Sequence, residues 1–203
     1  MKCKGKVNIK GENMKKLLVA AVILFGLGTA ANAMDLNGKL EVGVGSFYGI
    51  PTSSDFNDVV DNAFAWTLFA DYKVLNNVSV GLEYAQSFGY DISENGDGPD
   101  SIDENYFGIR GKYLLPFDIG NMKANAYGLV GIARYKWETD PDYVDDDGIG
   151  FSLGLGMNVD LTENIFAGAE ARYHFAPKFD VGGEEGSFDM NHMGVGIQAG
   201  YRF

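Results

Sequence analysis

Charged side chains recur at every second position in several short segments of this chain, where they alternate with apolar residues. Glu170 and Arg172 form one such pair, and Arg110 and Lys112 form another. Residues two apart in a strand point to the same face, so these segments predict a polar face that carries both signs of charge. Charges enclosed on such a face are expected to pair, because an unpaired buried charge is costly. The residues concerned are Lys39, Glu41, Asp71, Lys73, Glu83, Arg110, Lys112, Arg134, Lys136, Glu170, Arg172 and Arg202.

The two histidines, His174 and His192, are the side chains best suited to acid–base chemistry near neutral pH. A hydrolytic site would need a serine nucleophile beside a histidine that an acid orients. No serine occupies the neighbouring same-face positions of His174, and the chain contains neither a Gly-x-Ser-x-Gly nor a His-Glu-x-x-His motif. We therefore predict that the protein is not an enzyme, has no catalytic residues, and uses its histidines as hydrogen-bonding groups.

Acidic residues concentrate in four polar segments, and one of these contains the consecutive residues Asp145, Asp146 and Asp147. Clustered carboxylates suit calcium or magnesium, which could bridge the segments to one another or to lipid phosphates. The alternative is that the acidic charges only keep the surface solvated. Residues 91–96 resemble the start of a calcium-binding EF-hand loop, but Ile102 stands where the bidentate glutamate belongs, so we reject that interpretation. Apart from such divalent cations, we predict no cofactor.

The elements that position these residues are predicted to be strands, because apolar side chains alternate with small or polar ones. In the last segment, every odd position from Met193 to Phe203 is apolar, and the even positions are glycine or polar. The pattern predicts eight strands of roughly the 9–11 residues that a tilted membrane strand requires. They cover residues 39–48, 64–74, 78–84, 106–115, 127–137, 149–161, 165–175 and 192–203.

The segment 127–137 has the least regular alternation of the eight. We assign its aromatic residues, Trp137 among them, to the apolar face and Arg134 to the polar face, although Val130 and Ile132 then share the polar face. Aromatic residues near the strand ends, including those of this segment, are predicted to form girdles at the membrane interfaces.

The connections between the predicted strands alternate in length. Short turns at 75–77, 116–121 and 162–164 alternate with much longer loops. An even number of strands, with short turns on one side and long loops on the other, is typical of outer-membrane barrels. Lipid offers no hydrogen bonds to backbone groups, so an exported chain without spanning helices crosses a membrane only as a closed barrel.

We therefore predict an all-β fold, an eight-stranded antiparallel up-and-down transmembrane β-barrel, in the bacterial outer membrane. Both termini would lie on the periplasmic side, together with the short turns. The alternative is a soluble barrel or sandwich that buries the apolar faces, because period two alone does not say which face is inside.

The N-terminal region is predicted to direct export. Residues 14–33 contain a basic start, a short apolar run and a closing Ala31-x-Ala33, which is the pattern of a cleaved secretory signal peptide. The apolar run is well short of the ~20 residues that a membrane anchor requires. We divide the chain into a leader with its signal peptide, 1–33, and one barrel domain, 34–203.

The mature domain is strongly acidic. Removal of the leader takes away six lysines and one glutamate, so the formal net charge goes from −12 to −17. A net charge this negative disfavours nucleic acid as a partner. The single cysteine also lies in the leader, so the mature domain contains no disulfide.

The chain ends on an aromatic residue, Phe203, with Tyr201 two positions earlier on the same face. This ending resembles the C-terminal assembly signal of outer-membrane barrels, and the whole mature chain resembles the small eight-stranded family that includes the OmpA transmembrane domain and OmpX. The resemblance implies a monomer in the envelope of a Gram-negative bacterium. Its partners would be outer-membrane lipid, lipopolysaccharide and, through the C-terminal strand, the assembly machinery.

In such a barrel the polar face would line the lumen, which in an eight-stranded barrel is just wide enough for side chains to fill. A closed lumen would leave a structural or surface-interaction role without enzymatic activity. The alternative is a narrow porin-like conduit for ions or small solutes, lined by the same residues. We predict a charge network in the lumen that is made by Glu41, Glu83, Arg110, Arg134, Glu170, Arg172 and Arg202.

Overall fold

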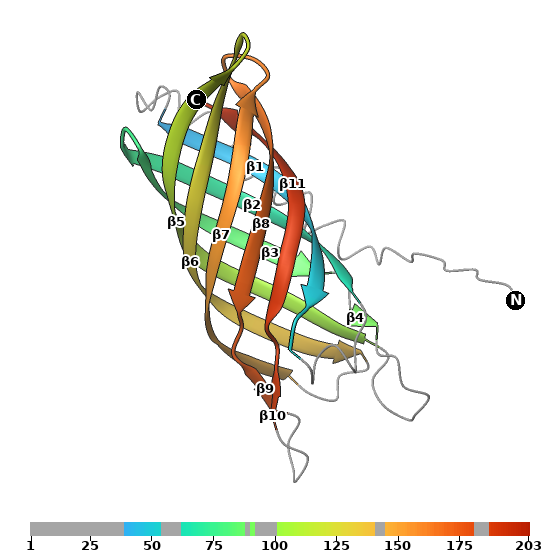
Figure 1. Cartoon of the computed structure of the whole chain (residues 1–203). Coiled ribbons are helices and arrows are strands. Elements are labelled where there is room, and N and C mark those ends of the chain that lie inside the picture. The colour runs from blue at the N-terminus through green and yellow to red at the C-terminus, as the bar shows by residue number, and fades with distance from the viewer. Residues whose placement is uncertain (1–38, 54–61, 88–89, 92–100, 141–144, 181–186) are drawn as a thin grey trace, which may run out of the picture.

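The computed structural model is a closed barrel of antiparallel strands (Figure 1), which confirms the predicted fold. It describes residues 39–53, 62–87, 90–91, 101–140, 145–180 and 187–203. The wall consists of β1 (Leu40–Pro51), β2 (Ala63–Leu75), β3 (Val78–Ser87), β5 (Ser101–Ile119), β6 (Met122–Asp140), β7 (Asp145–Asp160), β8 (Ile165–Phe175) and β11 (His192–Arg202). Three short strands extend it, namely β4 (Tyr90–Asp91), β9 (Lys178–Asp180) and β10 (Ser187–Asp189).

The barrel closes between its first and last strands. In the β1–β11 pair, Glu41 lies opposite Arg202 and Pro51 lies opposite His192. β3 pairs directly with β5, so the short β4 lies outside the cycle of eight strands. Closure pairs the backbone groups of every wall strand on both sides, as a strand surrounded by lipid requires.

The outer face of the wall is apolar and the inner face is polar. Leu155 and Ile197 are 72% and 69% exposed on the outside, whereas Asp71 and Glu170 are 1% and 2% exposed on the inside. A soluble carrier would have the reverse arrangement, with its apolar side chains enclosed. The structure therefore supports the membrane orientation that the alternation predicted.

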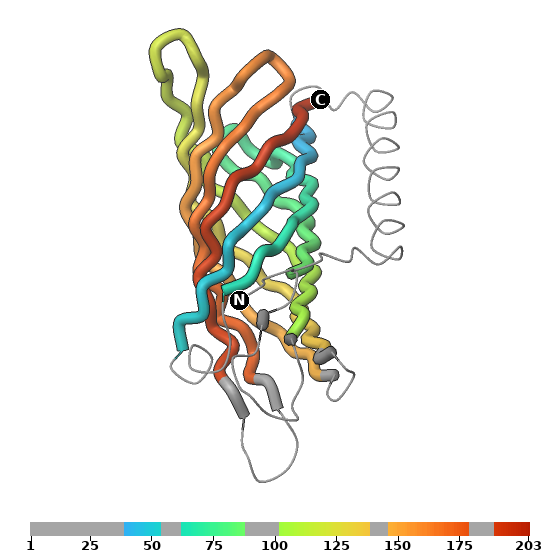
Figure 2. The backbone as a smooth tube through the Cα atoms, turned by 90° about the vertical axis from the view of Figure 1, so that its right-hand side faces the viewer, coloured from blue at the N-terminus to red at the C-terminus, as the bar shows by residue number. Residues whose placement is uncertain are grey.

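The short turns, the start of β1 and the end of β11 lie at one end of the barrel, and β4, β9 and β10 lie at the other (Figures 1 and 2). We call these the turn side and the loop side. The β5–β6 turn is shorter than predicted, because Pro116 belongs to β5 and Ile119 pairs with Met122. Gly120 has a φ of 61°, a left-handed conformation that glycine adopts without steric cost.

β6 faces the opposite way from the prediction. Trp137 and Tyr135 are 0% and 1% exposed inside the barrel, while the Arg134 side chain is 72% exposed outside. The register explains the orientation, because cross-strand partners share a face. Arg134 lies opposite the outward-facing Phe107, and Tyr135 lies opposite the inward-facing Tyr106. Both faces of β6 carry apolar residues, so its own alternation could not choose between them.

The predicted leader and signal peptide, residues 1–33, lie outside the described residues, and this assignment stays a prediction. Within the ranges that the structure describes, no helix is long and apolar enough to cross a membrane.

Candidate functional site

Six charged side chains form a layer across the lumen, and we call them the central layer. They come from β2, β3, β5 and β8, and each residue is at most 4% exposed. Three are carboxylates and three are cations, so the layer is neutral overall and no charge is left without an opposite one. Its members are Asp71, Glu83, Arg110, Lys112, Glu170 and Arg172.

Arg110 joins two carboxylates of the central layer. Its Nε and Nη2 donate to the two oxygens of Asp71 at 2.8 and 2.7 Å, and its Nη1 donates to Glu83 Oε2 at 2.5 Å. Lys112 Nζ lies 3.0 Å from Asp71 Oδ2. The guanidinium carbon of Arg110 also lies 4.1 Å from the centroid of the Phe69 ring. The two parallel hydrogen bonds to Asp71, together with the Phe69 ring against the guanidinium face, fix the guanidinium in one orientation.

Arg172 joins Glu83 to the third carboxylate, Glu170. Its guanidinium donates to both oxygens of Glu83 and, at 2.5 Å, to Glu170 Oε1. The Tyr106 hydroxyl donates to Glu83 at 2.6 Å, and the Tyr127 hydroxyl donates to Glu170 at 2.8 Å. The central layer is therefore one connected set of charge-assisted hydrogen bonds across the lumen.

The turn-side end of the lumen holds a second, wetter ion cluster. Arg202 Nε lies 2.8 Å from Glu41 Oε1, and its Nη1 lies 3.2 Å from Asp160 Oδ2. These side chains are 18%, 13% and 16% exposed. They line a cavity of about 430 Å³, to which Lys73 also contributes. The predicted network residues Glu41 and Arg202 thus pair with each other, apart from the central layer.

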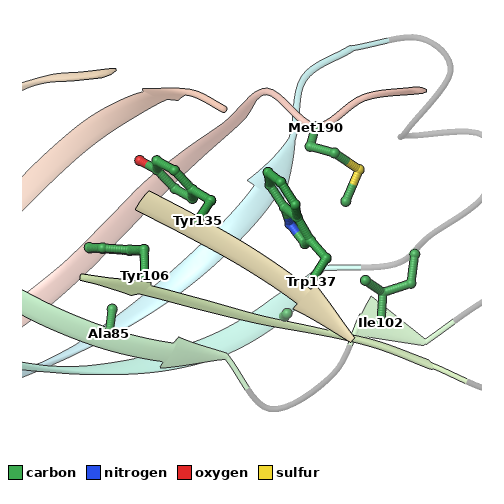
Figure 3. Packing of buried hydrophobic residues seen from close by; sticks show 7 residues of the cluster. Ala85, Ile102, Tyr106, Tyr135, Trp137 and Met190 are labelled. Atoms are coloured by element: carbon green, nitrogen blue, oxygen red, sulfur yellow. The ribbon is translucent and has the colours of Figure 1, made fainter. Parts of the chain in front are cut away.

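The loop-side part of the lumen is apolar, and we call it the outer chamber. Tyr106 of β5 and Tyr135 and Trp137 of β6 belong to one buried cluster with Ala85 and Met190, and Trp137 extends toward Met190 (Figure 3). The Tyr135 and Trp137 rings stack with centroids 5.8 Å apart, and Met190 is 1% exposed. The aromatic rings of β5 and β6 therefore make up most of the apolar packing in this part of the lumen.

A few polar groups are embedded in the outer chamber. The rings of His174 and His192 stack at 4.5 Å with an angle of 11° between their planes. The Tyr135 hydroxyl lies 2.8 Å from His174 Nδ1, and Glu104 Oε1 lies 3.6 Å from His192 Nε2. Trp137 Nε1 donates to Glu104 Oε2 at 3.2 Å. Glu104, which precedes the predicted strand 106–115, is a buried residue of β5.

The histidines do not form a hydrolytic triad with their neighbours. Ser152 lies opposite His174 in the β7–β8 pair, and both residues are buried. However, the Tyr135 hydroxyl occupies His174 Nδ1, and Glu104 faces His192 instead of His174. A triad needs the acid on the same histidine that receives the serine proton.

The outer rim of β6 and β7 carries exposed ion pairs, which we call the rim pairs. Arg134, predicted to lie in the lumen, has its Nε 2.6 Å from Asp147 Oδ2, and Lys136 Nζ lies 2.6 Å from Glu138 Oε1. The hydrogen bond and positive charge of Arg134 lower the pKa of Asp147. The placement of Arg134 in the lumen is therefore wrong, and its cause is the reversed face of β6.

The three consecutive aspartates lie in β7 and not in a loop. Asp147 pairs with Arg134, while the Asp146 carboxylate accepts a hydrogen bond from the Asp147 backbone at 2.8 Å. Successive strand side chains point to opposite faces, so the neighbouring side chains of Asp146 and Asp147 do not converge on one ion. Among the described residues, no group of three or more histidine, cysteine or acidic side chains is placed to hold a metal.

The sequence model of the family described as "Outer membrane protein beta-barrel domain" matches residues 17–203. The chain belongs to this family. The family is one of the bacterial outer membrane. A β-sheet protein crosses that membrane only as a closed barrel with an apolar exterior. No curated protein sequence matches the chain.

Solved structures with the same fold share little sequence with this family member. Neisserial surface protein A is 16% identical, with a TM-score of 0.58 over 81% of this chain and 97% of that chain. OprG from Pseudomonas aeruginosa is 19% identical, with a TM-score of 0.58 over 82% and 96%. Ail, the attachment invasion locus protein of Yersinia pestis, is 15% identical, with a TM-score of 0.50 over 82% and 99%. These likenesses show the barrel fold alone.

The C-terminal residues of this outer-membrane barrel lie on the turn side. The Tyr201 side chain is 42% exposed, and its ring packs edge-on against Phe203 with centroids 4.8 Å apart. The Phe203 amide donates to the Leu40 carbonyl at 2.9 Å, so the last residue also joins the closing pair of strands.

Sequence reasoning missed most of the outer chamber. It assigned the aromatic residues of β6 to the membrane girdles, yet Tyr127 and Trp137 are 2% and 0% exposed inside. One available signal was the pair Val130 and Ile132, which gave β6 a second apolar face. Another was the polar atom of each aromatic residue, which a buried site can use as a donor.

Proposed function

We propose that this outer-membrane barrel is a non-enzymatic structural or surface-interaction protein whose lumen is closed. The observation that carries the proposal is the central layer, in which Arg110 and Arg172 bind all three carboxylates and tie four strands together. Ions passing through would have to displace buried, bidentate pairs, at a large desolvation cost. The outer chamber adds an apolar barrier above the layer.

The proposed orientation places both termini and the short turns in the periplasm, with the monomer's long loops facing outward. Assembly would proceed through recognition of the C-terminal strand, for which Tyr201 and Phe203 present neighbouring rings at the turn side. Outer-membrane lipid surrounds the apolar belt, and lipopolysaccharide would contact the loop-side rim. The acidic loops could hold divalent cations that bridge to lipopolysaccharide phosphates.

Conductance in a planar lipid bilayer tests the closed lumen. We expect purified wild-type protein to give no stable channels at neutral pH. The double variant Glu83→Ala, Arg172→Ala removes one carboxylate together with one cation, so it opens space without leaving a net charge, and we expect it to conduct. Frequent stable channels in the wild type would overturn the proposal.

A narrow conduit is the second candidate, and the turn-side cavity of about 430 Å³ favours it. This cavity already gives solvent a path into the turn-side end of the lumen. If wild-type channels appear and their ion selectivity reverses in Arg110→Glu or Arg202→Glu, the conduit is the correct function. The same variants have no effect on selectivity if current leaks around the barrel.

A further inference from the structure

The two histidines of the chain lie in the outer chamber and are not required for the central layer to close the lumen. They are cross-strand partners in the β8–β11 pair, and both point inward. Their stacked rings place two titratable groups 4.5 Å apart, centroid to centroid, in a site shielded from solvent. Histidine is the side chain that ordinarily changes charge near neutral pH, so this pair is a candidate proton sensor.

The contact between His192 and Glu104 requires a proton. His192 Nδ1 lies 3.1 Å from the Met190 carbonyl oxygen, which can only accept, so Nδ1 carries a hydrogen. In a neutral ring, Nε2 would then be an acceptor, and it faces Glu104 Oε1 at 3.6 Å. Two acceptors facing each other are unfavourable. One proton therefore belongs to the pair, either on the imidazole or on the carboxyl group.

Among the residues that the structure describes, no carboxylate faces a ring nitrogen of His174 as Glu104 faces His192. His174 Nδ1 is bonded to the Tyr135 hydroxyl, and its ring packs on the Tyr106 ring with centroids 5.4 Å apart. The titratable and charged groups that act on it are His192 in the stacked ring, Arg172 on its own strand and Glu83 across the lumen. Glu83 is already bound by two arginines, so it offers little net attraction for a further cation.

We propose that His174 and His192 form a proton-operated latch that holds the outer chamber closed at neutral pH and releases it in acid. With one proton shared between His192 and Glu104, the stacked rings are stable. A further proton on His174 would place a cation beside Arg172 and against the His192 ring, which shares the first proton with Glu104. The rings must then separate.

Ring separation would be transmitted to the apolar packing of the chamber. The His192 ring is hydrogen-bonded to the backbone of Met190, whose side chain belongs to the same buried cluster as Trp137 (Figure 3). The Trp137 indole in turn donates to Glu104. Both links end on Trp137, so this residue should report the opening of the latch by becoming accessible to solvent.

The experiment uses the full barrel folded in phospholipid vesicles. The chain has two tryptophans, and Trp66→Phe leaves Trp137 as the single fluorescent one. Emission and acrylamide quenching are followed from about pH 7.5 to about pH 4, because burial and the charge of Arg172 disfavour the protonated form of His174, so that it needs more acid than an exposed histidine, whose pKa is ~6.5. We expect a reversible red shift and stronger quenching in acid. The readout does not depend on conductance, so its failure and that of the closed-lumen proposal are distinguishable.

The matched variant is His174→Gln, His192→Gln in the same background, which contains no histidine. We expect no transition in that pH range. Should this variant fail to give a heat-modifiable band on a gel, His174→Phe provides the test, because it keeps a ring against Tyr106 and loses the proton site. A Trp137 signal that is flat in the parent, or an equal acid transition in a folded variant without His174, would overturn the latch.

Discussion

The central layer and the rim pairs use the same arginine–carboxylate chemistry in opposite surroundings. Arg110 and Asp71 have side chains that are 3% and 2% exposed, whereas Arg134 and Asp147 have side chains that are 72% and 44% exposed. The distances are alike, at 2.7 and 2.6 Å. Contact geometry therefore does not tell which pair the fold depends on, and the difference in solvent access must decide it.

The two kinds of ion pair differ in stability because different groups surround a charge whose partner is removed. At the rim, water and ions take the place of a missing charge, so such pairs contribute little to stability. In the lumen, no solvent reaches a carboxylate that loses its arginine, and the desolvation cost stays uncompensated. The stability of the fold is therefore expected to depend on the central layer, while the rim pairs can be replaced at little cost.

The strongest test of this comparison is Arg110→Leu against Arg134→Leu. Arg110→Leu leaves three carboxylates with two cations, and we expect it to lower the free energy of unfolding by about 3–5 kcal/mol. Arg134→Leu should leave the unfolding transition unchanged, because Asp147 remains in water. Urea unfolding in lipid vesicles, followed by the gel shift between folded and unfolded forms, measures both. Equal losses in the two variants would contradict the role assigned to solvent access.

A smaller effect is expected when the packing beside the central layer is changed without touching a charge. A Cβ built on Gly156 would lie 2.3 Å from the Tyr127 hydroxyl oxygen, and Tyr127 is held by Glu170 and Gln198. Gly156→Ala should therefore cost about 1–3 kcal/mol of unfolding free energy.

Gly128→Ala is the matched control for this change. Gly128 lies beside Tyr127 on the lipid-facing side, where the nearest atom to an added Cβ is 4.0 Å away. This substitution should be neutral or slightly stabilising, because alanine restricts the unfolded chain. The same urea series compares the two variants, and equal stability would show that the Tyr127 ring can move aside.

Most of the fold, and the lumen-facing position of the central-layer residues, could be predicted from the sequence. Glu83, Arg110, Glu170 and Arg172 were placed on the lumen face because the alternation in β3, β5 and β8 is clean. Their partners could not be predicted, since Arg172 reaches Glu83 across the lumen and not along a neighbouring strand. Such contacts depend on strand tilt and stagger, which a period-two pattern does not contain.

The outer chamber was missed for a different reason. In β6, both faces are apolar, so the choice of face depended on its neighbours, and the error moved Arg134 inside and Trp137 outside. Glu104 was assigned to a loop because β5 starts earlier than its alternation suggested. Strand ends are set by pairing with the adjacent strand, here β6, and pairing is a property of the fold and not of the local sequence.

The smallest expected effect concerns the acidic end of β7, where the rim meets the loops. We expect Asp145→Asn, Asp146→Asn, Asp147→Asn to respond to millimolar calcium and to chelator as the wild type does, in both loop protease resistance and unfolding temperature. The physical reason is that the Asp146 and Asp147 side chains point to opposite faces of β7, together with the ion pair between Asp147 and Arg134. A calcium response shared by both proteins would assign the ion to other loop acids. A calcium response lost only in the variant would identify these aspartates as the calcium site. The rim would then have a specific function that depends on its charges.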